Sequence, residues 1–252
     1  MKYKHDKDMT HFGFKNIQKT KKNSMVSNIF DIVANKYDLM NDIMSFGIHR
    51  IWKHYTLQHS EVHSGNKVLD LAGGTGDLSI KFSKLVGNTG IVVLLDINYT
   101  MLCKGRDRLR NLGILNNIIY IQADAEYLPF PSNTFDCIAI SFGLRNFTNK
   151  EKALFSVYRV LKPRGKLLIL EFGAPTFSSF KKLYNLYSFN VLPKLGAVIT
   201  SSHDSYQYLV ESIRMNLDPE TLKDIITQTG FTNASYTNLT GGIAVLYSAY
   251  KK

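Results

Sequence analysis

A glycine loop between an apolar run and an amphipathic segment constrains the fold more than any other feature of this sequence. The run Val68–Leu71 predicts a buried strand, and the apolar residues of 78–86 repeat at the spacing of an amphipathic helix. Glycine permits positive φ and close ligand approach, and the helix N-terminus behind the loop offers unpaired backbone N–H groups. The order strand, glycine loop, helix therefore predicts a nucleotide-binding site.

The glycine spacing and two acids narrow the choice of nucleotide. A dinucleotide fingerprint needs G-x-G-x-x-G, but Gly74 and Gly76 are followed by Ser79 where the third glycine belongs. Asp70 lies in the first strand, and Asp96 ends the next apolar run, where it is placed to accept hydrogen bonds from two ribose hydroxyls. This arrangement of acid, glycine loop and acid resembles the S-adenosylmethionine (SAM) site of class I methyltransferases and favours SAM over a nicotinamide cofactor.

The rest of the chain alternates short apolar runs with helical patterns. Further strands are predicted at 118–121, 135–141 and 166–170, and a closing hairpin at 231–250. Such alternation is typical of a parallel sheet covered by helices on both faces. The helical segment from Val26 to Tyr55 precedes the first strand, and we expect it to cap the carboxyl ends of the strands, where open α/β sheets bind ligands.

Polar positions at the carboxyl ends of later strands complete the predicted pocket. Asp124 follows the third strand, where its carboxylate can accept the adenine amino group while the small Ala125 leaves room for the ring. Ser141 ends the fourth strand, beside the methyl-donor end of the pocket. Tyr37, in the polar run 36–42 of the cap, is a candidate to face cofactor or substrate; a half-buried packing tyrosine is the alternative.

Composition limits the class of protein. The chain has 252 residues, of which 44% are hydrophobic, as expected for one α/β domain with a modest cap. No run approaches the roughly 18 apolar residues of a membrane helix, and the N-terminus lacks the apolar core of a signal peptide, so we expect a cytoplasmic protein. Cys103 and Cys137 lack metal-ligand spacing, the histidines are scattered, and no metal is expected.

The formal net charge of +11 is unevenly spread, because the first 24 residues carry seven lysines against Asp6 and Asp8. We predict a basic, flexible arm over 1–24 and one domain over 25–252, with the cap at 25–64. Such an arm can dock on anionic lipid or nucleic acid, but it lacks the interleaved aromatic residues of a nucleic-acid surface. A solvated arm without a partner is the alternative.

Five stretches carry a family resemblance: VANKYDLMND (33–42), MSFGIHRIWK (44–53), DLAGGTGD (70–77), SFGLRN (141–146) and ESIRM (211–215). They resemble the ubiquinone/menaquinone biosynthesis C-methyltransferases of the UbiE type, over about 12–251. The resemblance implies a Rossmann-like class I methyltransferase fold, with a mostly parallel seven-stranded sheet and an N-terminal helical cap. It also implies SAM-dependent methylation of a ring carbon of 2-polyprenyl-6-methoxy-1,4-benzoquinol and of demethylmenaquinol. A turn is predicted at 161–165, before the strand at 166–170, and Arg164 departs there from the family, which usually has glycine at this position.

The resemblance also implies roles for individual residues. The implied SAM contacts, with Gly74 in the loop, are Thr75, Asp96, Asp124, Ala125 and Ser141. Carbon methylation is easiest when a ring hydroxyl is ionised, and ionising a phenol near pH 7 costs roughly 4 kcal/mol. Arg145 is our candidate to stabilise the developing phenolate oxygen, with an ion pair at the surface as the alternative; Asn146 and Tyr37 complete the predicted catalytic set. Asp38, His49 and an ordered water stay open as the proton acceptor.

A polyprenyl substrate lies in the bilayer, so we expect peripheral contact with the inner face of the membrane. The basic arm and the aromatic stretch 177–189 are the predicted means. A homodimer and a quinone-biosynthesis complex stay open, and no nucleic-acid partner is expected. Two alternatives come from other classes: an RNA methyltransferase, suggested by the net charge, and a non-catalytic scaffold subunit of a quinone-biosynthetic complex.

Overall fold

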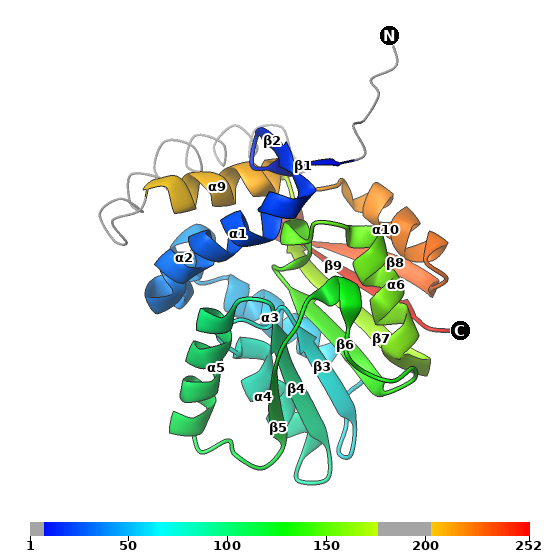
Figure 1. The fold of residues 1–252 in the computed structure, drawn as a ribbon. Helices are drawn as coiled ribbons and strands as arrows, with labels where there is room; N and C mark the ends of the chain where they lie inside the picture. The colour runs from blue at the N-terminus through cyan, green and yellow to red at the C-terminus, as the bar shows by residue number, and fades with distance from the viewer. Residues whose placement is uncertain (1–7, 176–202) are drawn as a thin grey trace.

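The computed structural model describes residues 8–175 and 203–252, and its centre is a seven-stranded sheet (Figure 1). The strands are β3 (Lys67–Leu71), β4 (Ile91–Asp96), β5 (Ile118–Gln122), β6 (Phe135–Ser141), β7 (Leu161–Phe172), β8 (Thr232–Leu239) and β9 (Ala244–Tyr250). They lie in the order β5-β4-β3-β6-β7-β9-β8. Six strands run in the same direction, and β9 runs opposite to them. The predicted mostly parallel sheet and closing hairpin are confirmed.

The strand order creates a crevice next to β3. The chain runs outward from β3 to β4 and β5, and then crosses back to place β6 on the other side of β3. Ligands of open α/β sheets bind where the order reverses in this way, outside the carboxyl ends of the strands. The fold thus places a ligand site at the end of β3, where the glycine loop begins.

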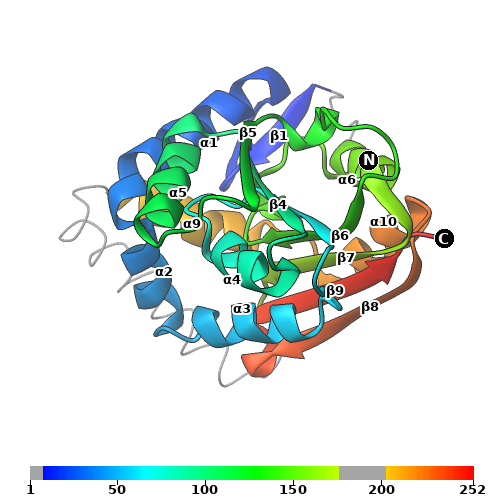
Figure 2. The ribbon, with the colours of Figure 1, turned by 90° about the horizontal axis from the view of Figure 1, so that it is seen from below.

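Helices cover both faces of the sheet, as Figure 2 shows from below. They are α3 (His49–Gln58), α4 (Asp77–Val86), α5 (Tyr99–Asn111), α6 (Lys150–Val160), α9 (His203–Arg214) and α10 (Pro219–Gln228). Alternate residues of β3 explain this: Val68 packs in one core with α3, α4, α5 and α9, whereas Leu69 and Leu71 pack in the other with α6 and α10. Strands buried on both faces read as continuous apolar runs.

The segment before the sheet forms a cap of three helices. Two of them are α1 (Lys19–Val33) and α2 (Tyr37–Ser45), joined by a 3₁₀ turn at 34–36, and α3 follows. The helical prediction for 26–55 is therefore confirmed. Figure 1 shows α1 and α2 lying across the carboxyl ends of the strands, on the same side as α9.

The structure differs from the predicted flexible arm of 1–24. A hairpin, β1 (Met9–Phe12) with β2 (Lys15–Gln18), precedes α1 and lies against α9. The physical reason is local packing, because the rings of Phe12 and Tyr208 stack with centroids 4.3 Å apart. Residues 1–7 and the predicted aromatic stretch 177–189 lie outside the described residues.

Two smaller expectations concern the end of the sheet and the membrane. The turn predicted at 161–165 belongs to β7, since Leu161 pairs with Phe135 and the Arg164 N–H donates to the Lys251 carbonyl. Arg164 has φ +62°, so the turn geometry that favours glycine is present without the glycine. Among the described residues, no helix is both long and apolar enough to cross a membrane.

Candidate functional site

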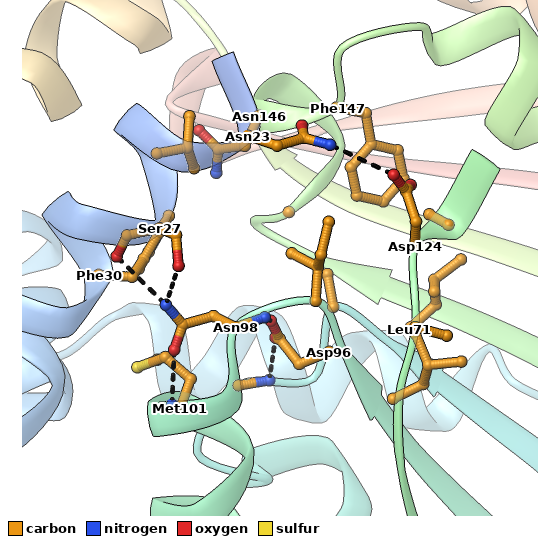
Figure 3. A pocket seen from close by; sticks show the side chains of 18 of the residues that line it. Asn23, Ser27, Phe30, Leu71, Asp96, Asn98, Met101, Asp124, Asn146 and Phe147 are labelled. Carbon is orange, nitrogen blue, oxygen red and sulfur yellow. Dashed lines mark hydrogen bonds between the residues drawn. The ribbon is translucent and has the colours of Figure 1, made fainter. Parts of the chain in front are cut away.

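A cavity of about 740 Å³, counting the space at its open mouth, lies at the carboxyl ends of β3, β4 and β5 (Figure 3). Its lining includes six of the predicted site residues: Tyr37, Gly74, Asp96, Asp124, Ala125 and Asn146. The sheet topology and the sequence prediction therefore converge on one place.

The glycine loop forms one wall of this cavity because its backbone turns where other residues are strained. Gly74 has φ +53° and Gly76 has φ +80°, both in the left-handed region that favours glycine. A Cβ on Gly76 would come within 2.5 Å of Leu109 on α5, so this glycine also lets α5 pack closely. The Gly74 N–H donates to Asp96 Oδ2 at 2.9 Å, which ties the loop to the end of β4.

Asp96 is held by backbone donors and faces the cavity. Besides Gly74, the N–H of Asn98 donates to Asp96 Oδ1 at 2.8 Å. Burial raises the pKa of Asp96 to about 6, although these hydrogen bonds act in the opposite direction. Each carboxylate oxygen keeps a second lone pair. The geometry suits acceptance of two hydroxyl donors, as in a ribose.

Asn98 connects the cavity to the cap. Its side-chain oxygen accepts from the Met101 N–H at 2.7 Å and so caps the N-terminus of α5. Its amide nitrogen donates to the Ser27 hydroxyl at 2.9 Å (Figure 3) and also to Asp31 at 2.9 Å, and both partners lie on α1. The end of β4 thus holds α1 over the cavity.

A second cap residue, Asn23, crosses the cavity mouth. Its amide nitrogen donates to Asp124 Oδ2 at 3.2 Å (Figure 3), and its oxygen accepts from the Thr148 hydroxyl at 2.8 Å. Asp124 Oδ1 accepts from the Glu126 N–H at 2.9 Å, and Ala125 beside it is buried. Sequence reasoning missed Asn23 and Ser27, because a polar residue on an isolated helix carries no signal of its distant partner.

A smaller hollow adjoins the cavity and shares Tyr37, Ala72, Gly74 and Phe142 with it. The predicted contacts Thr75 and Ser141 line this hollow, together with Asp70 and Lys53. These four side chains form the polar wall of the hollow.

The hollow contains buried polar atoms without partners in the described structure, namely Ser141 Oγ and Asp70 Oδ1. The other Asp70 oxygen accepts from the Ser79 hydroxyl at 2.6 Å, and burial raises the pKa of Asp70 to about 6. The buried Lys53 ammonium lies 2.6 Å from Asp77. Unpaired acceptors beside a lysine fit a group that carries both charges, such as the amino-acid end of SAM.

Arg145 occupies a different position from the one expected. Its guanidinium lies 3.0 Å from Glu171 on β7, and both side chains are at most 2% exposed. It also donates to the Phe142 carbonyl, and Nε lies 3.4 Å from Ser212 on α9. Arg145 does not belong to the described lining of either hollow, so it acts behind the wall. The ion pair predicted as the alternative exists, but it is buried.

Asn146 and Tyr37 both face the cavity. Asn146 ends the 3₁₀ turn η3 (Leu144–Asn146), and its side-chain oxygen accepts from the Tyr208 hydroxyl at 2.9 Å. Burial raises the pKa of Tyr37 to about 12, so its hydroxyl remains a neutral hydrogen-bond donor.

The two candidate proton acceptors are engaged elsewhere. His49 Nε2 lies 2.8 Å from Asp42, and burial lowers the pKa of His49. Asp38 accepts from the Thr75 hydroxyl at 3.0 Å and lies 3.2 Å from Arg108. Neither acceptor is among the described residues that line the two hollows.

Comparisons with known proteins agree with this geometry. A model of the ubiE/COQ5 methyltransferase family matches residues 17–251. A ubiquinone/menaquinone biosynthesis C-methyltransferase UbiE from Blochmanniella pennsylvanica (strain BPEN) is 68% identical, covering 100% of this chain and 99% of its own. One of the same name from Haemophilus ducreyi (strain 35000HP / ATCC 700724) is 58% identical over 97% and 94%.

Solved structures support the fold. A SAM-dependent methyltransferase from Aquifex aeolicus superimposes with a TM-score of 0.60 at 18% identity, covering 79% of this chain and 89% of that one. A putative SAM-dependent methyltransferase from Methanococcus maripaludis gives 0.57 at 17% identity and covers 93% of both chains.

Proposed function

Since the chain belongs to the ubiE/COQ5 methyltransferase family, we propose that it methylates a ring carbon of a polyprenyl quinol with SAM as the donor. The substrates are 2-polyprenyl-6-methoxy-1,4-benzoquinol and demethylmenaquinol, in ubiquinone and menaquinone biosynthesis; the relatives carry the corresponding name. The observation that carries the proposal is the cavity at the end of β3, where Asp96 and Asp124 face one space. Family membership favours this reaction over RNA methylation or a non-catalytic scaffold.

The residues present fit the cofactor. Asp96 would accept from the ribose hydroxyls, Asp124 would accept from the adenine amino group beside Ala125, and the wall with Ser141 and Thr75 would hold the amino-acid end. When bound, SAM supplies the electrophilic methyl group.

The substrate side of the cavity must favour an ionised ring oxygen. Asn146 and Tyr37 line it with hydrogen-bond donors, and donors aimed at a developing negative charge stabilise it most in a water-poor site. Arg145 contributes as a positioning residue, because it holds the Phe142 carbonyl and thereby the turn that presents Asn146. Glu171 offsets most of its charge, so we assign Arg145 no direct contact with substrate.

Transfer of a methyl group from SAM to each quinol tests the function directly. Purified protein is incubated with labelled SAM and with short-chain forms of each demethylated quinol, and the labelled carbon is located in the product. We expect the label on a ring carbon, and an Asp96→Asn variant, whose affinity for SAM should be much lower, serves as the control. Label on a ring oxygen, or none with either quinol, would overturn the proposal.

We further propose that the protein works in the cytoplasm, at the inner face of the membrane, and touches the bilayer with its N-terminal residues. Lys2, Lys4 and Lys7 lie ahead of the β1–β2 hairpin, so they can be removed without cutting a described element. Co-sedimentation with anionic vesicles should weaken when residues 1–7 are deleted. Equal binding by the full-length and shortened proteins would exclude these lysines as the contact.

A further inference from the structure

The hydroxyl of Tyr208 meets a cavity side chain from 62 residues away. Tyr208 lies on α9, is buried, and donates to Asn146 Oδ1 at 2.9 Å. Burial raises the pKa of Tyr208 to about 12, which keeps the donor proton in place. An asparagine amide has one oxygen acceptor and one nitrogen with two donors. When Tyr208 engages the oxygen, the nitrogen is the end left for the cavity.

The Tyr208 ring is fixed from its other side. Phe12 on β1 stacks on it with an interplanar angle of 24°. The hairpin that carries Phe12 is tied to α9, since the Phe14 N–H donates to Glu211 at 3.1 Å. The N-terminal hairpin therefore braces the hydroxyl that contacts Asn146.

Asn146 is held in place by its own turn. The turn follows β6, and its backbone is fastened by the Arg145 contact to Phe142 and by an N–H donation from Arg145 to Glu171 at 3.0 Å. Figure 3 places Asn146 across the cavity from Asp96. With the backbone fixed, the freedom left to this side chain is which end of the amide faces the cavity, and the hydrogen bond from Tyr208 to Oδ1 fixes that end.

We propose that Tyr208 is a positioning residue that keeps the amide nitrogen of Asn146 turned toward the cavity, as the donor for a negatively charged ring oxygen of the substrate. This proposal rests on the proposed function. A flipped amide would present its oxygen and repel the same charge. Tyr208 thus determines whether the substrate meets the N–H end of the Asn146 amide or its partly negative oxygen.

The test compares Tyr208→Phe with a matched control on the same helix. Tyr206 is also fully buried, but its hydroxyl has no partner in the described structure, so Tyr206→Phe removes the same atom without touching Asn146. In Tyr208→Phe we expect kcat/KM for a short-chain demethylmenaquinol to fall about tenfold at pH 7, the size of one hydrogen bond. The acidic limb of its pH profile should move to higher pH, because the ring oxygen ionises less readily. Calorimetry should show SAM affinity unchanged.

A double-mutant cycle with Asn146 separates the possible failures. Asn146→Ala should lose about 100-fold in kcat/KM, and Tyr208→Phe should add nothing to it, since the hydroxyl then has no amide to orient. Additive losses, an unmoved pH profile in Tyr208→Phe, or an equal shift in Tyr206→Phe would overturn the Tyr208 assignment alone. Full activity of Asn146→Ala would instead remove Asn146 from the proposed function.

Discussion

The floor and the roof of the cavity are held together by different kinds of contact. We call the ends of β3, β4 and β5 with the glycine loop the floor, and α1, the β1–β2 hairpin and α9 the roof. In the floor, Asp96 is fixed by backbone N–H groups of Gly74 and Asn98, and the strands are joined by ladder hydrogen bonds. In the roof, α1 is held by side chains, such as the bond from Asn23 to Asp124.

This difference explains how the site can be rigid and still exchange its cofactor. Backbone contacts of the floor cannot break without disturbing the sheet, whereas the side-chain contacts of α1 can break one at a time. Segments held by few, partly exposed contacts open with the lowest free energy. We therefore expect variants of the floor to change affinity and variants of the roof to change rates.

The largest effect is expected beside the floor, where Arg145 pairs with Glu171 at the end of β7 and contacts Ser212 on α9 of the roof. Arg145→Met leaves a buried carboxylate unpaired and should lower the free energy of unfolding by about 3–5 kcal/mol. Arg145→Met with Glu171→Gln should recover most of it, as measured by urea denaturation. If the double variant is no more stable than the single one, the unpaired Glu171 carboxylate is not the cause of the loss.

A large effect on affinity is expected from Asp96→Asn in the floor. In either amide orientation an NH₂ group faces the N–H of Gly74 or Asn98, and the charge that we propose accepts the ribose hydroxyls is lost. SAM affinity should fall about 100-fold, from a loss of roughly 1.5–3 kcal/mol for a charged hydrogen bond and the added backbone conflict. Thr75→Val is the matched floor control and should cost only a few-fold, by calorimetry.

Lowering the pH should change SAM affinity and protein stability in opposite directions. The pKa of Asp96 is raised to about 6, above its unfolded value, so the cofactor-free protein gains stability from this group as pH falls from about 6 toward 4. SAM needs the ionised carboxylate, so its affinity should fall up to about tenfold per pH unit below 6. Calorimetry from pH 7.5 to 5 measures this slope. If SAM affinity falls with pH just as steeply in Asp96→Asn, another group causes the pH dependence.

The smallest effect is expected from Asn23→Ala in the roof. The variant removes two exposed side-chain hydrogen bonds across the cavity mouth, to Asp124 and from Thr148, so SAM affinity should change by no more than a few-fold. Stopped-flow fluorescence should show both binding and release of SAM becoming faster. A large loss of affinity with unchanged rates would mean that Asn23 belongs to the floor, and the distinction between the two regions would fail.

The floor could be predicted from sequence because its polar residues stand at regular places, next to the apolar runs that form the strands. Gly74, Asp96 and Asp124 each follow an apolar run, and parallel strands bring such positions to one edge. The helices of the cap could be predicted, but the contacts that hold the roof could not, since Asn98 contacts Ser27 across 71 residues and nothing in either segment marks the pairing. Glu171 is an exception: an acid inside the apolar run of β7 signals a buried partner, and that signal could have led to Arg145.

The order of the strands has a practical consequence at the end of the sheet opposite the cavity. Loops such as 112–117 turn there, far from the glycine loop along the strands, and Leu115 is 63% exposed. A Leu115→Cys variant could carry a fluorescent dye or a surface tether without entering the cavity. Single molecules held by that point would keep the roof free, so its opening could be timed while quinol and methyl donor come and go.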